Sequence, residues 1–64
     1  MYRFHVEWLN KSGRICSTDS ELTYSDYDSA YADAVAFAKV AKIETGKIAI
    51  LLGERVIDEI SIIL

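Results

Sequence analysis

The chain has 64 residues, a net charge of −3 at pH 7 and a hydrophobic content of 52%. This composition argues against intrinsic disorder, and the length allows a single domain that spans residues 1–64. The one cysteine, Cys16, excludes an intramolecular disulfide, no Cys/His spacing fits a metal site, and no apolar run approaches the ~20 residues that cross a membrane. We therefore expect a soluble, cytoplasmic protein without metal or cofactor, for which oligomerisation is the remaining source of extra stability.

Residues 2–9 alternate between apolar and polar side chains, which predicts a strand with one buried face. The sequence "NKSG" that follows is typical of a turn, so we expect a hairpin in which Trp8 faces Cys16 and His5 faces Asp19. In that register the Cys16 thiol lies on the apolar side as a packing residue. The other predicted pairs are Val6–Thr18, Phe4–Ser20, Tyr2–Leu22, Leu9–Ile15 and Arg3–Glu21.

The next segment predicts a helix. Ser25 is a suitable N-cap because Asp28 follows it three residues later, and alanine is abundant from residue 30 to residue 41. Gly46 is expected to end the helix. At about 100° per residue, the side chains that face the sheet are Tyr27, Ala30, Tyr31, Ala34, Ala38 and Ala41, with Phe37 at their flank.

Two further strands are predicted at about residues 47–52 and 55–63, joined by "GE" as a two-residue type II′ turn. The second of these strands breaks its alternation, which indicates a β-bulge at Asp58 and Glu59. The chain is therefore predicted to be an α+β protein of element order ββαββ, with one helix packed on one face of a four-stranded antiparallel sheet.

This element order and the alanine-rich middle helix resemble small stand-alone ββαββ proteins of bacteria and their phages, including some anti-CRISPR inhibitors. The resemblance covers the whole chain and includes no catalytic or binding motif. It implies a phage-encoded, anti-defence protein that inhibits another protein in the host cytoplasm, and it transfers no functional residue to this sequence.

Residues suited to catalysis are sparse. His5 is the only histidine, and in the predicted register Asp19 could orient it while Ser17 lies on the same face. These residues would stand on an open strand surface, and no predicted loop is long enough to enclose a pocket that excludes water. We therefore interpret His5 and Asp19 as a surface pair and expect that the protein is not an enzyme.

Acidic and aromatic residues gather around the start of the helix, and the sequence has no lysine or arginine between Arg14 and Lys39. Carboxylates stabilise a helix N-terminus, so one interpretation is that they only cap the helix. The alternative is a tyrosine-edged acidic patch that binds a basic groove of another protein. Its residues would be Asp19, Glu21, Asp26, Tyr27, Asp28, Tyr31 and Asp33.

The expected topology also separates charge between the two ends of the molecule. The predicted basic pole consists of Lys11, Arg14, Lys39, Lys42 and Lys47. The predicted acidic pole consists of Asp19, Glu21, Asp26, Asp28 and Glu54. The basic pole supports an alternative function, which is weak binding of nucleic acid.

Two sets of apolar residues lack cover in a single copy of the predicted fold. One is a stripe on the outer helix face, made of Ala32, Ala36, Val40 and Ile43. The other belongs to the two-sided apolar segment 48–64 and consists of Leu51, Val56 and Ile63. A symmetric homodimer would bury one set, with the sheet as the favoured interface. We expect a small non-enzymatic module that binds another protein as an inhibitor or adaptor.

Overall fold

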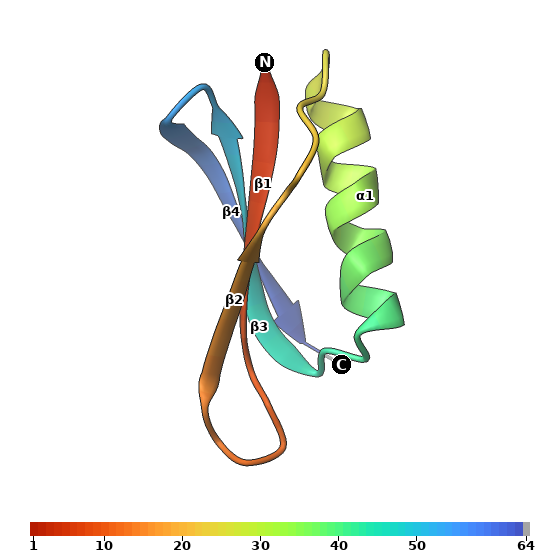
Figure 1. The fold of residues 1–64 in the computed structure, drawn as a ribbon, viewed down its shortest axis with the longest axis vertical. Helices are drawn as coiled ribbons and strands as arrows, with labels where there is room; N and C mark the ends of the chain where they lie inside the picture. Colours follow the sequence, from red (N-terminus) through yellow and green to blue (C-terminus); the bar gives the residue numbers. More distant parts are fainter. Residues whose placement is uncertain (64) are drawn as a thin grey trace.

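The strands and the helix follow the predicted order. The computed structural model describes residues 1–63; Leu64, with which the predicted apolar segment ends, lies outside the described residues. The elements are β1 (Tyr2–Leu9), β2 (Ile15–Asp19), α1 (Tyr27–Val40), β3 (Thr45–Leu52) and β4 (Arg55–Ile63). All strand pairs are antiparallel, the strand order is β2-β1-β3-β4, and α1 lies on one face of the sheet (Figure 1). The predicted ββαββ architecture is confirmed.

The register of the first hairpin agrees with the prediction along the whole of β2. Trp8 pairs with Cys16, and His5 pairs with Asp19. The other confirmed pairs are Val6–Thr18 and Leu9–Ile15. The alternation of β1 therefore places its apolar side chains toward the helix, where Phe4 and Val6 are buried.

The pairing changes after β2. The Ser20 N–H donates to the Phe4 carbonyl at 2.9 Å, and the Ser20 hydroxyl accepts from the Phe4 N–H at 3.2 Å. Because the Ser20 side chain takes the place of a backbone acceptor, the chain leaves the ladder at this point. Tyr2 then pairs with Tyr24, so the predicted Tyr2–Leu22 pair is wrong, and Leu22 is 64% exposed.

The helix begins one residue later than predicted, with Asp26 rather than Ser25 as the N-cap. Asp26 has an extended backbone, and its Oδ1 accepts a hydrogen bond from the Ser29 N–H at 2.8 Å. The aspartate side chain caps the free N–H group and also places a negative charge at the positive end of the helix dipole.

The helix ends earlier than predicted, at Val40. Lys42 adopts a left-handed conformation with a φ of 56°, and its N–H donates to the Lys39 carbonyl at 3.2 Å. The Ile43 N–H donates to the Ala38 carbonyl at 3.0 Å, which completes a Schellman motif. This turn directs Ile43 back into the core, where it is 2% exposed. The prediction that Ile43 belongs to the outer helix stripe is therefore wrong.

Gly46 lies inside β3 and does not end the helix, which corrects the predicted helix stop. It pairs with Trp8 of β1. A Cβ atom at this position would lie 2.5 Å from the Glu7 carbonyl oxygen and 2.9 Å from the Trp8 Cβ atom. The absence of a side chain therefore allows β1 and β3 to approach each other closely here.

The turn between β3 and β4 is held against the start of β1. Gly53 has a φ of 65° and Glu54 does not share the positive φ, as the predicted type II′ turn requires. The Gly53 N–H donates to the Met1 carbonyl at 3.0 Å, and the Arg3 guanidinium donates two hydrogen bonds to the Gly53 carbonyl at 3.0 and 3.2 Å. Arg3 is thereby held by the turn, and the predicted Arg3–Glu21 pair is not formed.

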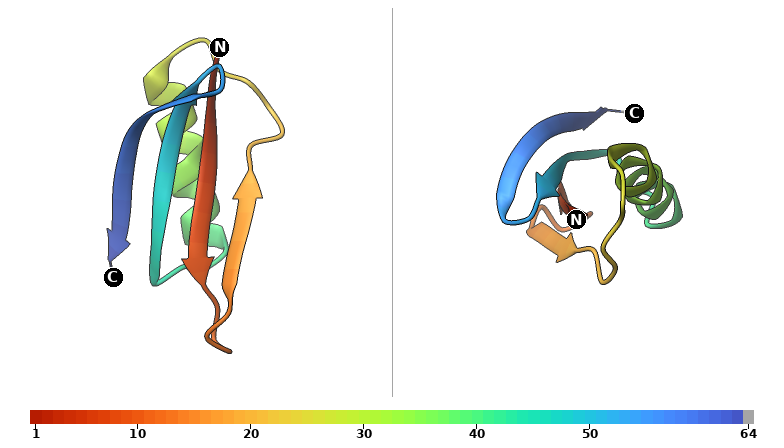
Figure 2. Two further views of the ribbon diagram at one scale, coloured as in Figure 1. Left: turned by 90° about the vertical axis from the view of Figure 1, so that its left-hand side faces the viewer. Right: turned by 90° about the horizontal axis from the view of Figure 1, so that it is seen from above.

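β4 contains a bulge, but earlier than predicted. Ile50 pairs with Asp58 and Leu51 pairs with Val56, which leaves Ile57 rather than Asp58 as the extra residue. Because paired residues point to the same side of a sheet, Asp58 faces the helix. A bulge also increases the local twist of its strand. Figure 2 shows β4 curving toward the side of the sheet on which α1 lies.

The helix rests on the two central strands through small residues. Ala30 and Ala34 have no exposed surface, and the backbone of α1 lies close to β1 and β3 and farther from β4. The buried core consists of Phe4, Val6, Ala30, Ala34, Ala38, Ile43, Ile48 and Ile50. Ala41, which was predicted to face the sheet, is exposed because it is the C-cap residue.

Gly46→Ala should lower the free energy of unfolding by about 1–3 kcal/mol, because the added methyl group overpacks the contact between β1 and β3. Urea denaturation followed by Trp8 fluorescence measures this change. Thr45→Ala, at the exposed neighbouring position of β3, is the control and should change stability by no more than about 0.5 kcal/mol. Wild-type stability of Gly46→Ala would contradict the close approach of the two strands.

Candidate protein-binding surface

A groove of about 210 Å³ runs between α1 and β4, where the helix leaves the last strand uncovered. Its floor is formed by the buried side chains of Ala38, Ile43 and Ile48. Its walls are Tyr31, Val35 and Lys39 of α1 on one side and Ile60 and Ile62 of β4 on the other. A groove with this mainly apolar lining suits the apolar side chains of another polypeptide.

One end of the groove is closed by a tyrosine and an aspartate. The Tyr27 hydroxyl donates to Asp58 Oδ2 at 2.5 Å, and the rings of Tyr27 and Tyr31 stack with their centroids 6.1 Å apart. The hydrogen bond to Asp58, followed by burial and by the negative charge of that carboxylate, raises the pKa of Tyr27 to about 12. This closure depends on the bulge, because the bulge turns Asp58 toward the helix.

β4 is an edge strand, so among the described strands nothing pairs with its outer main-chain groups. Its first half carries features that discourage pairing with a further strand, namely the bulge at Ile57 and the charges of Asp58 and Glu59. The second half, residues 60–63, has neither feature and borders the groove. We call the strand edge and the groove together the α1–β4 surface, formed by Tyr31, Val35, Lys39, Ile60, Ser61, Ile62 and Ile63.

The structure separates the residues of the predicted acidic patch. Asp19 lies on the open sheet face, where its Oδ1 is 2.7 Å from His5 Nδ1. The Tyr24 hydroxyl donates to Asp33 Oδ2 at 2.8 Å, on the flank of α1 away from the groove. Burial of Tyr24, followed by its hydrogen bond to Asp33 and the charge of that group, raises the pKa of Tyr24.

The remaining acidic residues lie near the start of the helix. Hydrogen bonds from the side chain and the N–H of Ser29 hold the pKa of Asp26 below its ordinary value. Asp28 is exposed in the first turn of α1, and Glu21 is exposed in the segment between β2 and α1. The residues of the predicted acidic patch therefore occupy several surfaces, and Asp26 is engaged in capping.

The apolar residues predicted to lack cover are also spread out. The residues that remain on the outer helix face are Ala32, Ala36 and Val40. On the open sheet face, Leu51 pairs with Val56 at one end and Ile63 pairs with Thr45 at the other. Between these ends lie two rows of residues that are paired with one another across the four strands. One row is Asp19, His5, Ala49 and Glu59, and the other is Ser17, Glu7, Lys47 and Ser61. Because most of these side chains are polar or charged, they separate the apolar residues at one end of the open face from those at the other.

The predicted pairing of His5 with Asp19 is confirmed, and Ser17 lies on the same open face, opposite Glu7. Within residues 1–63, no group of three or more His, Cys, Asp or Glu side chains is placed to hold a metal ion. The single helix of the described chain is too short and too polar to cross a membrane.

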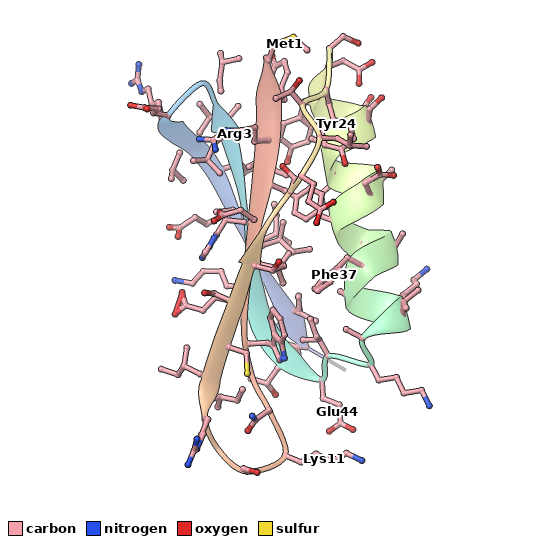
Figure 3. The ribbon with its side chains drawn as sticks, viewed as in Figure 1. Met1, Arg3, Lys11, Tyr24, Phe37 and Glu44 are labelled. Carbon is pink, nitrogen blue, oxygen red and sulfur yellow. The ribbon has the colours of Figure 1, made fainter. Side chains whose placement is uncertain are left out.

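The predicted separation of charge is incomplete. Lys11 lies at the same end of the molecule as Glu44, and Arg3 lies toward the opposite end (Figure 3). Lys47 Nζ is 3.6 Å from Glu59 Oε2, so this lysine forms an ion pair on the open face. Of the predicted basic pole, Lys47 is therefore paired with an acidic residue, and Glu44 lies at the end of the molecule where Lys11 is found.

Comparison with protein-family models, with curated proteins and with solved structures finds no match to this chain. The likeness to small ββαββ proteins of phages therefore rests on element order and the alanine-rich helix. A function has to be inferred from the geometry of the chain itself.

Sequence reasoning missed the groove, although the sequence contains two signals for it. The residues Ala30, Ala34 and Ala38 predict that the helix lies close to whichever strands it covers. The alternation of Ile60 and Ile62 after the bulge predicts an apolar strand face. Neither signal states which strands the helix covers, because strand order is set by pairing between distant segments.

Tyr27→Phe should make the free energy of unfolding fall less steeply with pH above about pH 10. The pKa of Tyr27 is about 12 in the folded protein, compared with about 10 for a tyrosine in an unfolded chain. The stabilisation by the Tyr27–Asp58 hydrogen bond is therefore complete below about pH 10 and is lost as the pH rises toward about 12. Urea unfolding at a series of pH values between about 9 and 12 measures this slope.

Asp58→Asn is the matched variant, because it removes the carboxylate that accepts the hydrogen bond. In this variant too, the free energy of unfolding should fall less steeply over the same pH interval. Tyr24, whose pKa is also raised, keeps its own contribution in both variants. If Tyr27→Phe loses stability as steeply as the wild type in this interval, the hydrogen bond does not have the effect inferred from the structure.

Proposed function

We propose that the protein is a non-enzymatic protein-binding module that adds an extended segment of another protein to the outer edge of β4. The observation that carries the proposal is the strand edge at residues 60–63, which lacks the bulge and charges of the preceding half and borders an apolar groove. In strand addition, the edge supplies main-chain hydrogen bonds and the groove accepts alternate side chains of the added segment.

The chemistry of the α1–β4 surface defines the segment that would fit it. Val35, Ile60 and Ile62 favour an apolar side chain at every second position of the added strand. Lys39 lies in the last turn of α1, at the end of the groove away from the Tyr27–Asp58 closure, and favours a carboxylate there. The expected partner segment is therefore an extended, alternating apolar strand with an acidic residue at one end.

A module of this kind acts by occupying a strand of its partner or by bridging two proteins, as an inhibitor or an adaptor. The His5–Asp19 pair lies on the open face, outside the groove, which supports a non-enzymatic role. A phage origin and an anti-defence role belong to the proposal through the likeness in element order.

Binding of nucleic acid has less support from the described residues. The aromatic side chains of β1, which could stack on bases, pack toward the helix core: Tyr2, Phe4 and Trp8. Lys11 shares its end of the molecule with Glu44 (Figure 3). An uninterrupted basic groove with exposed aromatic rings, as single-stranded nucleic acid requires, is not formed by these residues.

The proposal is tested by NMR titration of ¹⁵N-labelled protein with synthetic strand peptides of about six residues. The peptides alternate valine or isoleucine with serine and end in aspartate. We expect amide shift changes at residues 60–63 and on the groove side of α1, with β2 unchanged, because β2 lies at the opposite edge of the sheet.

The matched control is the same set of peptides with N-methyl groups on the main-chain nitrogens that pair with β4. These peptides keep their side chains but lose the hydrogen-bond donors that strand addition needs, so they should not bind. Unchanged β4 amides with the whole panel, or equal binding of the methylated peptides, would contradict the proposed function.

A further inference from the structure

We propose that one occupant of the α1–β4 surface is β4 of a second copy of this chain, paired antiparallel about a two-fold axis at Ser61. The inference rests on the proposed function, because it uses the same strand edge. It replaces the homodimer expected from the sequence, in which Leu51, Val56 and Ile63 would meet face to face, with a dimer that joins two sheets edge to edge.

The two faces of β4 restrict the register of such a pair. Beyond the bulge, Asp58 and Ile60 pair with residues that face the helix, whereas Glu59 and Ser61 pair with residues on the open face. Directly opposed residues of an antiparallel pair point to the same side of the sheet. The two-fold axis must therefore lie at a residue of β4 and not between two residues.

Charge and side-chain shape then select one residue for the axis. An axis at Asp58 or Glu59 would place two carboxylates opposite each other, which destabilises a strand pair. An axis at Ile60 would bring the bulged Ile57 into the paired segment, opposite Ile63 of the second copy, and an axis at Ile62 would pair only residues 61–63 of the described chain. An axis at Ser61 pairs Ile60 with Ile62 of the second copy at two symmetric positions and leaves the bulge outside the paired segment.

The resulting dimer has one continuous sheet with both helices on the same face. Ile60 and Ile62 of both copies form an apolar cluster between the two grooves. On the open face, Ser61 meets its own copy and Glu59 lies opposite Ile63 of the second copy. A single strand pair is smaller than the roughly 1,200–2,000 Å² of a stable interface, so we expect a weak dimer that forms at high micromolar concentration.

Cysteine cross-linking tests the position of the axis. Ser61→Cys in a Cys16→Ser background places two thiols across the axis at the Cα separation of about 4.5–5.5 Å of opposed strand residues, which a disulfide can span. Ser17→Cys in the same background is the matched control. Ser17 and Ser61 are exposed serines in one row of the open face, on the two opposite edge strands.

Under mild oxidation at high micromolar concentration, Ser61→Cys should form disulfide-linked dimers on a non-reducing gel, and Ser17→Cys should form far fewer. Circular dichroism confirms that both variants are folded. Equal cross-linking of the two variants, or no cross-linking of folded Ser61→Cys, would overturn the inference.

A charge exchange tests the register. Ile63→Glu introduces a carboxylate opposite Glu59 at two symmetric positions and should raise the dimer dissociation constant about 2- to 30-fold. Adding Glu59→Lys converts both contacts to opposite charges and should restore dimerisation. Val40→Glu adds the same charge on the exposed outer helix face, away from β4, and should leave sedimentation equilibrium unchanged. Failure of Glu59→Lys to restore the dimer, or loss of the dimer in Val40→Glu, would overturn the register.

The peptide titration separates failure of this inference from failure of the proposed function. A protein that gives no Ser61→Cys cross-link but shifts its β4 amides with strand peptides would overturn the dimer and keep the binding function. A protein that cross-links at Ser61→Cys but responds to none of the peptides would support the dimer and overturn binding of foreign segments.

Discussion

A single helix is too narrow to cover a four-stranded sheet, and much of the structure follows from this mismatch. A helix with its side chains is about 10–12 Å across, whereas strands spaced about 4.8 Å apart make the sheet wider than that. The small side chains of Ala30, Ala34 and Ala38 let α1 settle on β1 and β3. The two outer strands therefore keep part of their helix-facing side uncovered.

The two edge strands differ in length and in their contacts with the helix. β2 is short, and on its neighbour β1 the Trp8 ring packs edge to face against the Phe37 ring of α1, with the ring centroids 5.6 Å apart. β4 is longer, and the Tyr27 side chain of α1 reaches it through the hydrogen bond to Asp58 at one end of the groove. A short edge strand offers a partner few main-chain groups. This asymmetry makes β4 the edge with more main-chain and apolar surface available to another polypeptide.

Local patterns in the sequence were sufficient to predict the element order, the register of the β1–β2 hairpin and the turn at Gly53, because each of these depends on residues close in the chain. The errors occur where distant backbone decides the outcome. Gly46 fits a helix stop by local rules, but its pairing with Trp8 explains its position. Ile43 is buried only because Lys42 adopts a left-handed conformation. The groove depends on strand order, which no local pattern contains. Of the residues predicted for a site, Tyr31, Lys39, Ile43 and Ile63 line it, but they were assigned to separate surfaces, and its apolar walls Val35, Ile60 and Ile62 were missed.

β1 and β3 form the centre of the sheet, although they are distant in the chain: Trp8 pairs with Gly46, and Tyr2 pairs with Leu52. Each of these strands also belongs to a hairpin with its neighbour in sequence. Pairings between nearby residues form faster than pairings that close long loops. The sheet therefore consists of two hairpins of local pairings, joined by one long-range pairing that closes most of the chain into a loop, and Gly46 lies at that junction.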